Sequence, residues 1–535
     1  MRRIESKLDL ASEEFRLNRA HNCGLAEKLK ERHRVTRRER PARDLERLSR
    51  QNKMFVRDRI ELLLDPGTPF LELSTLAANT EYGGEVPGAG IVSGIGIVNG
   101  REIIIHADDA SVKGGAWYPL SVKKIVRTLD IAIENRLPVV HLCDSAGGFL
   151  PLQADIFADR YLAGRIFRNQ SILSKLGVPQ VAIVLGHCTA GGAYVPALSE
   201  YNVIVRGTGA IFLGGPPLVK AATGEDVTVD ELGGADVHTR ISGTADYPAT
   251  NEEQAIAIAR ELVGQTPRPT KLDVEQIAPE PPYYDPDELY GVIPRDIKVQ
   301  FDVREVIARL VDGSRFHEYQ PAYGTTLICG FAHIWGFKVG ILGNNGVLFN
   351  DSSLKGAHFM QLCNQSRVPM IFLQNITGYM VGRDYEHRGI TKDGAKMIMA
   401  VSGSEVPKIT VICNGSFGAG NYGMAGRAFD PRFLFMWPQS QISVMGAEQA
   451  ANVLADIKIR QLSREGRSLS VAEVAAIREP ILEEYRRQSS AYYSTSQLWD
   501  DGILDPPDTR NALAMAISVA LNAPIDRPHY GVFRM

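Results

Sequence analysis

Short apolar runs alternate with longer segments of helical periodicity along most of this chain. Residues 137–142 and 181–186 are apolar runs of strand length, and Ser121–Asn135 has the apolar spacing of an amphipathic helix. Further helices are predicted at 392–401 and 510–521, and further strands at 409–413 and 433–437. This alternation of short strands with helices predicts an α/β layered fold.

The same order of elements occurs twice. The strand before the turn at 144–148 and the strand before the turn at 375–379 correspond, 231 positions apart (375 minus 144). Glycine turns at 191–192 and 418–420 correspond at 227 positions (418 minus 191). A looser match joins residues 99–103 to residues 335–339. A repeat of this length predicts two copies of a whole domain, not a solenoid.

Glycine turns follow the predicted strands in both copies. A strand that ends in a glycine turn and continues as a helix leaves peptide N–H groups unpaired and lets a ligand approach the backbone. Such donors can stabilise a developing negative charge, as an oxyanion hole does. A tight packing turn is the alternative for each motif alone. Because the motif is doubled, we favour two sites that hold two oxyanions, such as two enolates exchanging a group.

The repeat and a segment rich in proline and acidic residues set the expected domain boundaries. Residues 1–20 are predicted to be an extension, 21–272 the first domain, 273–296 a linker, and 297–535 the second domain. Residues 11–60 are predicted to be helical, with many basic residues among glutamates. A solvated helix packed on a neighbour explains this mixture, and an arm that binds nucleic acid is the alternative.

Composition narrows the class of protein. The 535 residues carry a net charge of -3, which gives no general attraction to nucleic acid or membranes. The six cysteines form no C-x-x-C pair, so buried free thiols and a reducing compartment are expected. No apolar run is long enough to span a bilayer and no targeting peptide is evident, so a cytoplasmic location is expected. No spacing of His, Cys, Asp and Glu predicts a metal site.

One loop and one cysteine near the predicted turns have competing interpretations. Lys113 and Gly114 lie in a glycine-containing loop that is either an ordinary surface loop or one that faces a ligand phosphate. Cys188 precedes the turn at 191–192 and is either an activated thiolate or, as we favour, a small apolar residue at a strand end.

The whole chain resembles the carboxyltransferase (β) subunits of biotin-dependent acyl-CoA carboxylases. The similarity is most specific at residues 188–196, 212–225 and 421–424. This family is a two-domain branch of the crotonase (ClpP/crotonase) fold, and the chain is more similar to its methylcrotonyl-CoA and geranyl-CoA carboxylase class than to the propionyl- or acetyl-CoA class. The resemblance implies that the first domain binds acyl-CoA and the second binds carboxybiotin. It also implies a hexameric core of a dodecamer, with active sites between domains of different protomers.

The resemblance also assigns roles to individual residues. The thioester enolate oxygen would be held at Gly147, Gly148, Gly191 and Gly192, and the biotin ureido oxygen at Gly378, Tyr379, Ala419 and Gly420. Further contacts to the CoA and biotin groups are expected from Lys113, Gly114, Ala193, Tyr194, Asn421 and Tyr422. Biotin itself takes the substrate proton in such enzymes. The chain lacks a carrier lysine between two methionines, since residues 394–397 supply only one methionine. A separate α subunit is therefore expected to carry biotin and to use ATP and Mg²⁺.

One departure from the family bears on the acyl chain. Methylcrotonyl-CoA members commonly carry Phe where this chain has Ala163, and the turn at 145–148 is also altered. A small Ala163 predicts room for a longer chain, so geranyl-CoA is favoured over 3-methylcrotonyl-CoA as the acceptor carboxylated at its γ-carbon. Phe149 could fill the same space, which is the competing interpretation. A propionyl- or acetyl-CoA carboxyltransferase and a carboxybiotin-dependent decarboxylase subunit remain alternatives; a stand-alone hydratase or a scaffold leaves the doubled turns unexplained.

Overall fold

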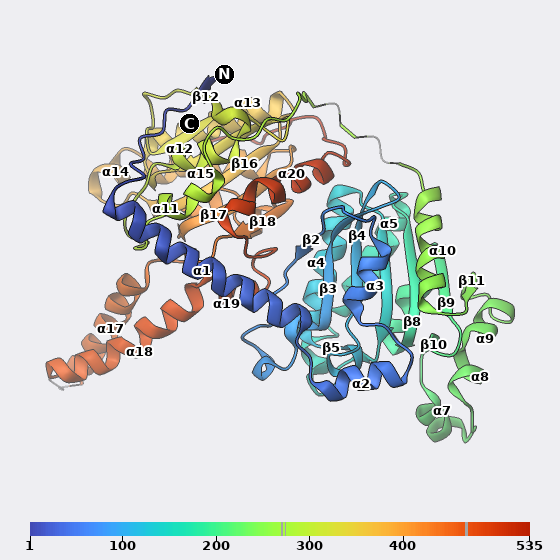
Figure 1. Ribbon diagram of the computed structural model, residues 1–535. Helices are drawn as coiled ribbons and strands as arrows, with labels where there is room; N and C mark the ends of the chain where they lie inside the picture. The colour runs from blue at the N-terminus through green and yellow to red at the C-terminus, as the bar shows by residue number, and fades with distance from the viewer. Residues whose placement is uncertain (269–270, 273, 466–468) are drawn as a thin grey trace.

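The computed structural model describes residues 1–268, 271–272, 274–465 and 469–535 (Figure 1). The chain builds two large sheets, one from each half, and each sheet has helices on both faces. The strands of the first sheet lie in the order β11-β9-β8-β6-β4-β3-β2, with β10 beside β8. The second follows the order β1-β12-β13-β14-β16-β17-β18, with β15 beside β16 and β19 beside β17.

The first half contains the elements that lead to the first pair of glycine turns. Its strands are β2 (Leu71–Leu73), β3 (Ile91–Val98), β4 (Arg101–Asp108), β5 (Ala116–Trp117), β6 (Val139–Ser145), β7 (Gly147–Gly148), β8 (Gln180–Thr189), β9 (Tyr201–Val205), β10 (Ala210–Phe212) and β11 (Tyr247–Ala249). Its helices are α2 (Ala42–Arg50), α3 (Val56–Leu63), α4 (Pro119–Asn135), α5 (Ala163–Lys175), α6 (Tyr194–Ala197), α7 (Pro216–Thr223), α8 (Val229–Gly233), α9 (Ala235–Arg240) and α10 (Glu252–Gln265).

The second half repeats this order. Its strands are β12 (Arg315–Tyr319), β13 (Leu327–Ile334), β14 (Phe337–Asn344), β15 (Gly346–Leu348), β16 (Met370–Tyr379), β17 (Lys408–Phe417), β18 (Phe433–Met436) and β19 (Gln441–Ser443). Its helices are α11 (Leu289–Val292), α12 (Val303–Leu310), α13 (Asn350–Gln365), α14 (Arg383–His387), α15 (Ile390–Ser402), α16 (Gly420–Gly423), α17 (Ala447–Arg464), α18 (Val471–Ser489), α19 (Ala491–Ser496) and α20 (Thr509–Ala520).

Apolar side chains from both faces of the central strands form the cores. In the first half α3 and α10 cover one face of the sheet, while α4 and α5 cover the other. Alternate residues of one strand therefore pack into different cores. On β4, Ile104 packs under α4 and α5, whereas Ile103 and Ile105 pack under α3 and α10. In the second half α12 and α20 cover one face and α13 and α15 cover the other. A sheet buried on both faces needs continuous apolar strands, which is the pattern seen in the sequence.

The two central parallel strands of each sheet change register at their carboxyl ends. Between the two paired positions that flank the break, β6 and β16 advance by two residues, whereas their neighbours β8 and β17 advance by four. The hydrogen-bonded ladder is therefore interrupted there. The pairs before the break are Cys143–Val184 and Gln374–Ile412, and the pairs after it are Ser145–Cys188 and Ile376–Ser416. The break lies at corresponding positions, 231 apart on β6 and β16 (374 minus 143) and 228 apart on β8 and β17 (412 minus 184). The predicted doubled α/β architecture is thus present in both topology and register.

The elements predicted from apolar spacing are confirmed. The helix expected at 121–135 is α4, and the strands expected at 137–142 and 181–186 are β6 and β8. The helical segment expected at 11–60 is divided into α1 (Glu13–Arg38), α2 and α3, because Pro41 starts a new helix and residues 51–55 are not helical. All six cysteines are free thiols, and five of them are buried.

The N-terminus belongs structurally to the second half. β1 (Arg2–Arg3) pairs antiparallel with β12, and α1 runs from there across to the first half (Figure 1). Asn22 on α1 donates to the carbonyl oxygens of Tyr290 and Ile293 at 2.9 and 2.8 Å. Residues 1–20, predicted as an extension, therefore lie against the second half. Residue 273, the first residue of the predicted linker, lies outside the described residues.

Asp501 ties the two halves together. Its carboxylate accepts from Arg127 of α4 at 2.9 Å and from Arg427 of the second half at 2.9 Å, and its carbonyl oxygen accepts the N–H of Ser74 at 2.7 Å. Burial would raise the pKa of Asp501, but the two guanidinium groups outweigh burial and hold that pKa below its usual range. A buried carboxylate paired in this way requires both halves to be folded and docked.

Two buried histidines in the first sheet make stability depend on pH. The Nδ1 atoms of His106 on β4 and His141 on β6 lie 3.0 Å apart. Burial lowers the pKa of His141 from 6.5 to about 4, and burial together with its neighbour lowers the pKa of His106. Both imidazoles are therefore neutral in the folded protein at neutral pH.

We expect the free energy of unfolding to fall as the pH is lowered from about 6.5 toward about 4, because the unfolded chain binds protons that the buried imidazoles do not. For His141 the shift corresponds to about 3 kcal/mol. Denaturant unfolding across this pH window should show a shallower pH dependence in His141→Gln than in the exposed control His529→Gln. Identical slopes in the two variants would contradict the assignment.

Candidate functional site

The first pair of glycine turns lies at the carboxyl ends of β6 and β8. The β7 residues Gly147 and Gly148 pair with β5, and a Cβ on Gly147, whose φ is +84°, would lie 3.0 Å from the carbonyl oxygen of Thr189. A Cβ on Gly192 would lie 3.4 Å from the side chain of Ser145. The two turns therefore contact each other, and the register break supplies the backbone that forms them.

The N–H groups of this first site are not equivalent. Residues 190–193 form a short 3₁₀ turn that continues into α6, and the first N–H groups of a helix have no intrahelical partner. The N–H of Gly147 donates to Ser145 Oγ at 3.0 Å. Gly147 thus serves the shape of the turn, because its own amide already has an acceptor.

The second pair of turns has the same arrangement. A Cβ on Gly420 would lie 2.5 Å from Ile376 Cγ2 and 3.6 Å from the Cα of Gly378, so the ends of β16 and β17 are in contact. Hydrogen bonding in α16 begins with the N–H of Asn421 donating to Gly418, at 3.2 Å. The N–H groups of Ala419 and Gly420 precede it and have no acceptor among the described residues. They are a pair of adjacent peptide donors suited to one oxygen anion.

The family of the chain follows from comparison with known proteins. Residues 48–531 match the carboxyl transferase domain family.

This chain belongs to the carboxyl transferase family.

Two curated relatives match most of this carboxyl transferase. It is 54% identical over 497 residues to the mitochondrial methylcrotonoyl-CoA carboxylase beta chain of Dictyostelium discoideum, covering 92% of this chain and 84% of the relative. It is 54% identical over 487 residues to the biotin-dependent 3-methylcrotonyl-coenzyme A carboxylase beta1 subunit of Mycobacterium tuberculosis, covering 91% and 92%. The family resemblance inferred from the sequence is confirmed.

The carboxyl transferase is also similar to a solved structure. The beta subunit of geranyl-CoA carboxylase from P. aeruginosa superposes with a TM-score of 0.88 at 39% identity, covering 99% of each chain. This similarity confirms the predicted crotonase-type fold over the whole length.

Two exposed tyrosines flank the donor turns of the carboxyl transferase at corresponding positions. Tyr194 is 45% exposed and Tyr422 is 48% exposed, 228 positions apart (422 minus 194). The residue before each, Ala193 or Asn421, is buried. The Asn421 amide donates to Ser416 Oγ at 2.8 Å, so this side chain supports the turn from inside the domain.

The other residues predicted to contact ligands have defined partners. Lys113 pairs with Glu85, and a Cβ on Gly114 would meet no atom within 4 Å, as expected of an accessible loop. Phe149 stacks on Tyr118 with ring centroids 4.4 Å apart. Ala163 is the first residue of α5 and is partly buried. The Tyr379 ring is packed against Gly394, so this residue offers its backbone to the second turn.

The structure adds charged residues that the sequence did not single out. Asp144, which begins the first turn, accepts from Lys53 at 2.8 Å and from Arg59 at 3.3 Å, and its N–H donates to Asp108. Burial raises the pKa of Asp108 from 3.8 to about 7, against hydrogen bonds from Trp117 and Asp144 that lower it. No motif links these residues, since Lys53 and Asp144 are 91 positions apart.

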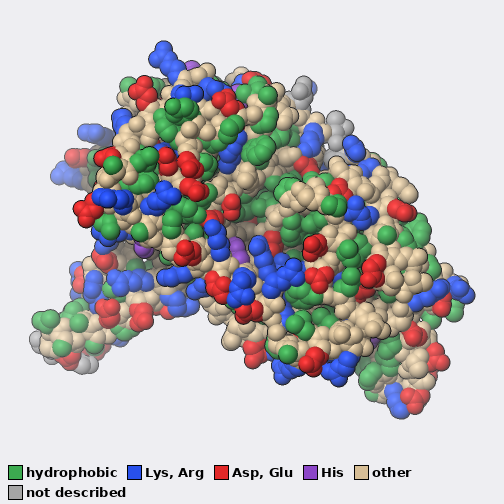
Figure 2. All heavy atoms as spheres, in the orientation of Figure 1, with side chains coloured by type: hydrophobic (Ala, Val, Ile, Leu, Met, Phe, Trp, Pro, Cys, Tyr) green, Lys and Arg blue, Asp and Glu red, His purple; other side chains and the backbone are tan. Residues whose placement is uncertain are grey.

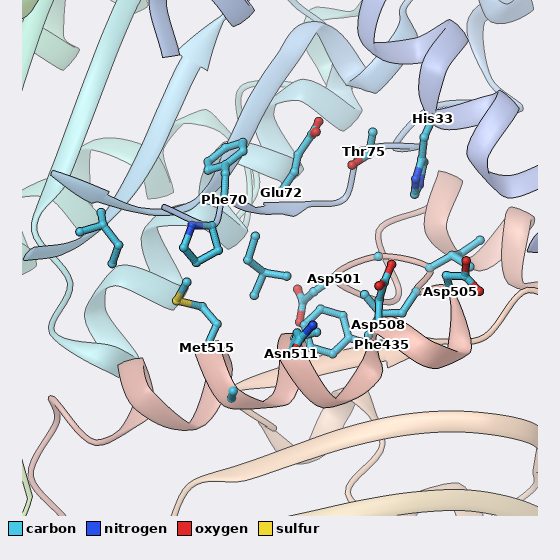
Figure 3. Close-up of a pocket in the computed structure, with 18 of the residues that line it drawn as sticks. His33, Phe70, Glu72, Thr75, Phe435, Asp501, Asp505, Asp508, Asn511 and Met515 are labelled. Carbon is cyan, nitrogen blue, oxygen red and sulfur yellow. The ribbon is translucent and has the colours of Figure 1, made fainter. Parts of the chain in front are cut away.

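A cleft of about 1420 Å³ separates the two halves of the chain, away from the glycine turns. Figure 2 shows the surface hollowed there, and in Figure 3 Phe70 and Glu72 of the first half lie across the cleft from Met515 and Asn511 of the second half. Among the described residues, those that line the cleft include neither pair of turns. In the part of the chain that the structure describes, no group of His, Cys, Asp and Glu residues could hold a metal ion, and no helix is long and apolar enough to cross a membrane.

We expect Gly115→Ala to be much more destabilising than Gly114→Ala. Both residues have positive φ, +75° and +68°, so both variants lose about 1 kcal/mol or more from backbone strain. A Cβ at Gly115 would also lie 2.1 Å from the carbonyl oxygen of Asp144, whereas a Cβ at Gly114 meets no atom within 4 Å. The clash should add about 2 kcal/mol. Thermal unfolding of the two variants measures the difference, and equal losses would show that the loop does not press on the first turn.

Proposed function

We propose that this carboxyl transferase is the β subunit of a biotin-dependent acyl-CoA carboxylase. It moves CO₂ from carboxybiotin to the γ-carbon of a branched α,β-unsaturated acyl-CoA. The observation that carries the proposal is the doubled donor turn: the first half offers the turns at 147–148 and 191–192, and the second those at 378–379 and 419–420. A transfer between two enolates needs two such sites.

The site residues act through their backbone. Carboxybiotin, brought by a partner chain, supplies CO₂ and the base that removes the γ-proton of the substrate. The N–H groups of Ala419 and Gly420 would hold the ureido oxygen of biotin and would stabilise negative charge there. The turn at 191–192 and Gly148 hold the thioester oxygen, where charge collects after the γ-proton has left, and the γ-carbon then bonds to CO₂. These fixed donors favour the charged states because they need no reorganisation.

We propose that a complete site needs a second copy of the chain. The glycine turns do not line the cleft between the halves of one chain. Exposed apolar side chains lie beside both sites, namely Leu150, Phe157, Leu213 and Leu218 in the first half and Val381 and Val444 in the second. An unusually apolar surface of this kind marks a protein contact. A hexameric core in which the first half of one copy faces the second half of another fits these surfaces.

The partner is an α subunit that carries biotin and makes carboxybiotin from ATP, Mg²⁺ and bicarbonate. Lys396, the lysine most similar to a carrier lysine, pairs with Asp393 at 3.2 Å on α15, not on a hairpin. The six free thiols support a location in the reducing cytoplasm.

We propose geranyl-CoA as the preferred acceptor over 3-methylcrotonyl-CoA. Ala163 is small and only partly buried, and Phe149 is already stacked on Tyr118, which supports open space beside α5. Curated relatives are named for methylcrotonyl-CoA and the similar structure for geranyl-CoA, so both acceptors belong in the test.

Carboxylation of an acyl-CoA panel that depends on ATP and bicarbonate, with the partner chain present, tests the proposed function. We expect turnover of the two γ-carboxylated acceptors and at least about tenfold lower kcat/KM for propionyl-CoA and acetyl-CoA. Preference for propionyl-CoA, or decarboxylation without any carboxylation, would contradict the proposal and favour a propionyl-type transferase or a decarboxylase subunit.

Substitution at Ala163 tests the acyl pocket. We expect Ala163→Phe to lose about tenfold or more of its kcat/KM for geranyl-CoA, because the ring fills the proposed space, while 3-methylcrotonyl-CoA is spared. The control is Gly164→Ala, whose new Cβ meets no atom within 4 Å and should spare both substrates. An equal loss of kcat/KM for both substrates in Ala163→Phe would contradict the proposal that Ala163 leaves room for the longer acyl chain.

A further inference from the structure

The repeat allows the two donor sites to be compared position by position. Three positions lie behind each turn: one just before α3 or α12, one on the first strand (β6 or β16), and one on the neighbouring strand (β8 or β17). The two strand positions are buried in both halves, whereas the position before the helix is partly buried in the first half and exposed in the second. In the first half they are Lys53, Asp144 and Gly186, and in the second half Gln300, Asn375 and Asn414. The offsets are those of the surrounding elements: 247 (300 minus 53), 231 (375 minus 144) and 228 (414 minus 186). One site is therefore backed by charges and the other by neutral amides.

The charged set fills the space opened by the register break. Asp144 Oδ1 accepts from Lys53 Nζ at 2.8 Å, and Oδ2 accepts from Arg59 at 3.3 Å. Arg59 Nε also donates to Glu252 at 2.7 Å, so the buried charges are balanced. A Cβ on Gly186 would lie 1.8 Å from Asp144 Oδ1, which explains why this position is glycine.

The neutral set connects the same three positions by amide hydrogen bonds. Asn375 Nδ2 donates to Gln300 Oε1 at 3.3 Å, and Asn414 Nδ2 donates to Asn375 Oδ1 at 3.1 Å. Asn414, at the position that corresponds to Gly186, thus donates to Asn375 in the second half, as the ammonium of Lys53 donates to Asp144 in the first. Both sets fasten the residue at which the turn begins.

Contacts of the backbone at Asp144 and of the next residue connect Asp144 to the turns that hold the peptide donors. A Cβ on Gly115 would lie 2.1 Å from the Asp144 carbonyl oxygen. The next residue, Ser145, donates from Oγ to the Gly115 carbonyl at 3.1 Å and accepts the N–H of Gly147 at 3.0 Å. Its side chain also lies beside Gly192. All the segments of the first site therefore pack on the dipeptide 144–145.

We propose that Asp144, through its ion pairs with Lys53 and Arg59, is the positioning residue of the acyl-CoA donor site. Asn375 does the same for the biotin donor site without charge. This inference rests on the proposed function, since it divides the reaction between the two sites. Neutralising Asp144 leaves the ammonium of Lys53 without its carboxylate and loosens the first turn, while the second turn, in the other sheet, keeps its own amide network. Misplacing a donor by about 1 Å can lower the rate about 100-fold.

The test measures two reactions with radiolabelled free carboxybiotin. Transfer to acyl-CoA needs both sites. Decarboxylation without acyl-CoA needs only the second: the bond from nitrogen to carbon breaks, CO₂ leaves, and water protonates the nitrogen. We expect Asp144→Asn to lower kcat for transfer about 100-fold, with KM for acyl-CoA changed less, and to leave decarboxylation within about twofold. The matched variant Asn375→Asp should lower both reactions. An Asp144→Asn variant that lowers both reactions equally, or neither, overturns the proposal.

A double variant separates positioning from loss of fold. Lys53→Gln combined with Asp144→Asn recreates the amide pair of the second half. We expect its transfer rate to be about tenfold higher than that of Asp144→Asn alone. A double variant whose loss of transfer rate is the sum of the two single losses, in free energy, would contradict the proposal. If Asp144→Asn does not fold, Lys53→Met, which keeps the pair with Arg59, must still lower transfer selectively. A wild-type chain that performs neither reaction instead refutes the proposed function.

Discussion

The register break at the carboxyl ends of the central parallel strands is the constraint on which the rest of the structure depends. A regular ladder between β6 and β8, or between β16 and β17, would engage the backbone to the last residue. Two extra residues on one strand interrupt the ladder, and the chain then turns into a short helix whose first amides have no partner within the helix. The helices on both faces of each sheet keep the paired strands fixed up to the break.

The two halves meet this constraint with different chemistry. Behind the first break the chain buries a carboxylate, which is tolerable only because an ammonium and a guanidinium are buried with it. Behind the second it buries the amides of Asn375 and Asn414, which hydrogen-bond to each other, and Asn375 also donates to the exposed Gln300. The halves are then joined by Asp501, whose partners come from both. One fold thus presents two donor sites of the same shape in two electrostatic settings, which suits the different anions proposed for them.

Sequence patterns predicted the fold well because both faces of each sheet are covered. Buried strands are continuous apolar runs, so β6, β8, β17 and β18 were found from hydrophobicity, and the repeat was found from glycine spacing. The packing of residues 1–20 on the second half was not predicted, because nothing in their composition points to β12. Contacts of this kind join segments that are distant in the chain.

The candidate site was predicted less completely. The family resemblance placed the turns, and the structure brings each pair together, but it also engages the N–H of Gly147 with Ser145 and the side chain of Asn421 with Ser416. Neither is visible in a motif, since both depend on how a turn folds back. The network of Lys53, Asp144 and Arg59 was missed for the same reason. A comparison of the repeats at 53 and 300 could have found it, because the same position carries a charge in one copy and an amide in the other.

The most direct test is a structure of the assembled enzyme with an acyl-CoA and a biotin derivative bound. We expect the thioester oxygen within about 3 Å of amides of the turn at 191–192, and the ureido oxygen within about 3 Å of the Ala419 and Gly420 amides contributed by another copy. Ligand oxygens held instead by side chains in the cleft between the halves of one chain would contradict it.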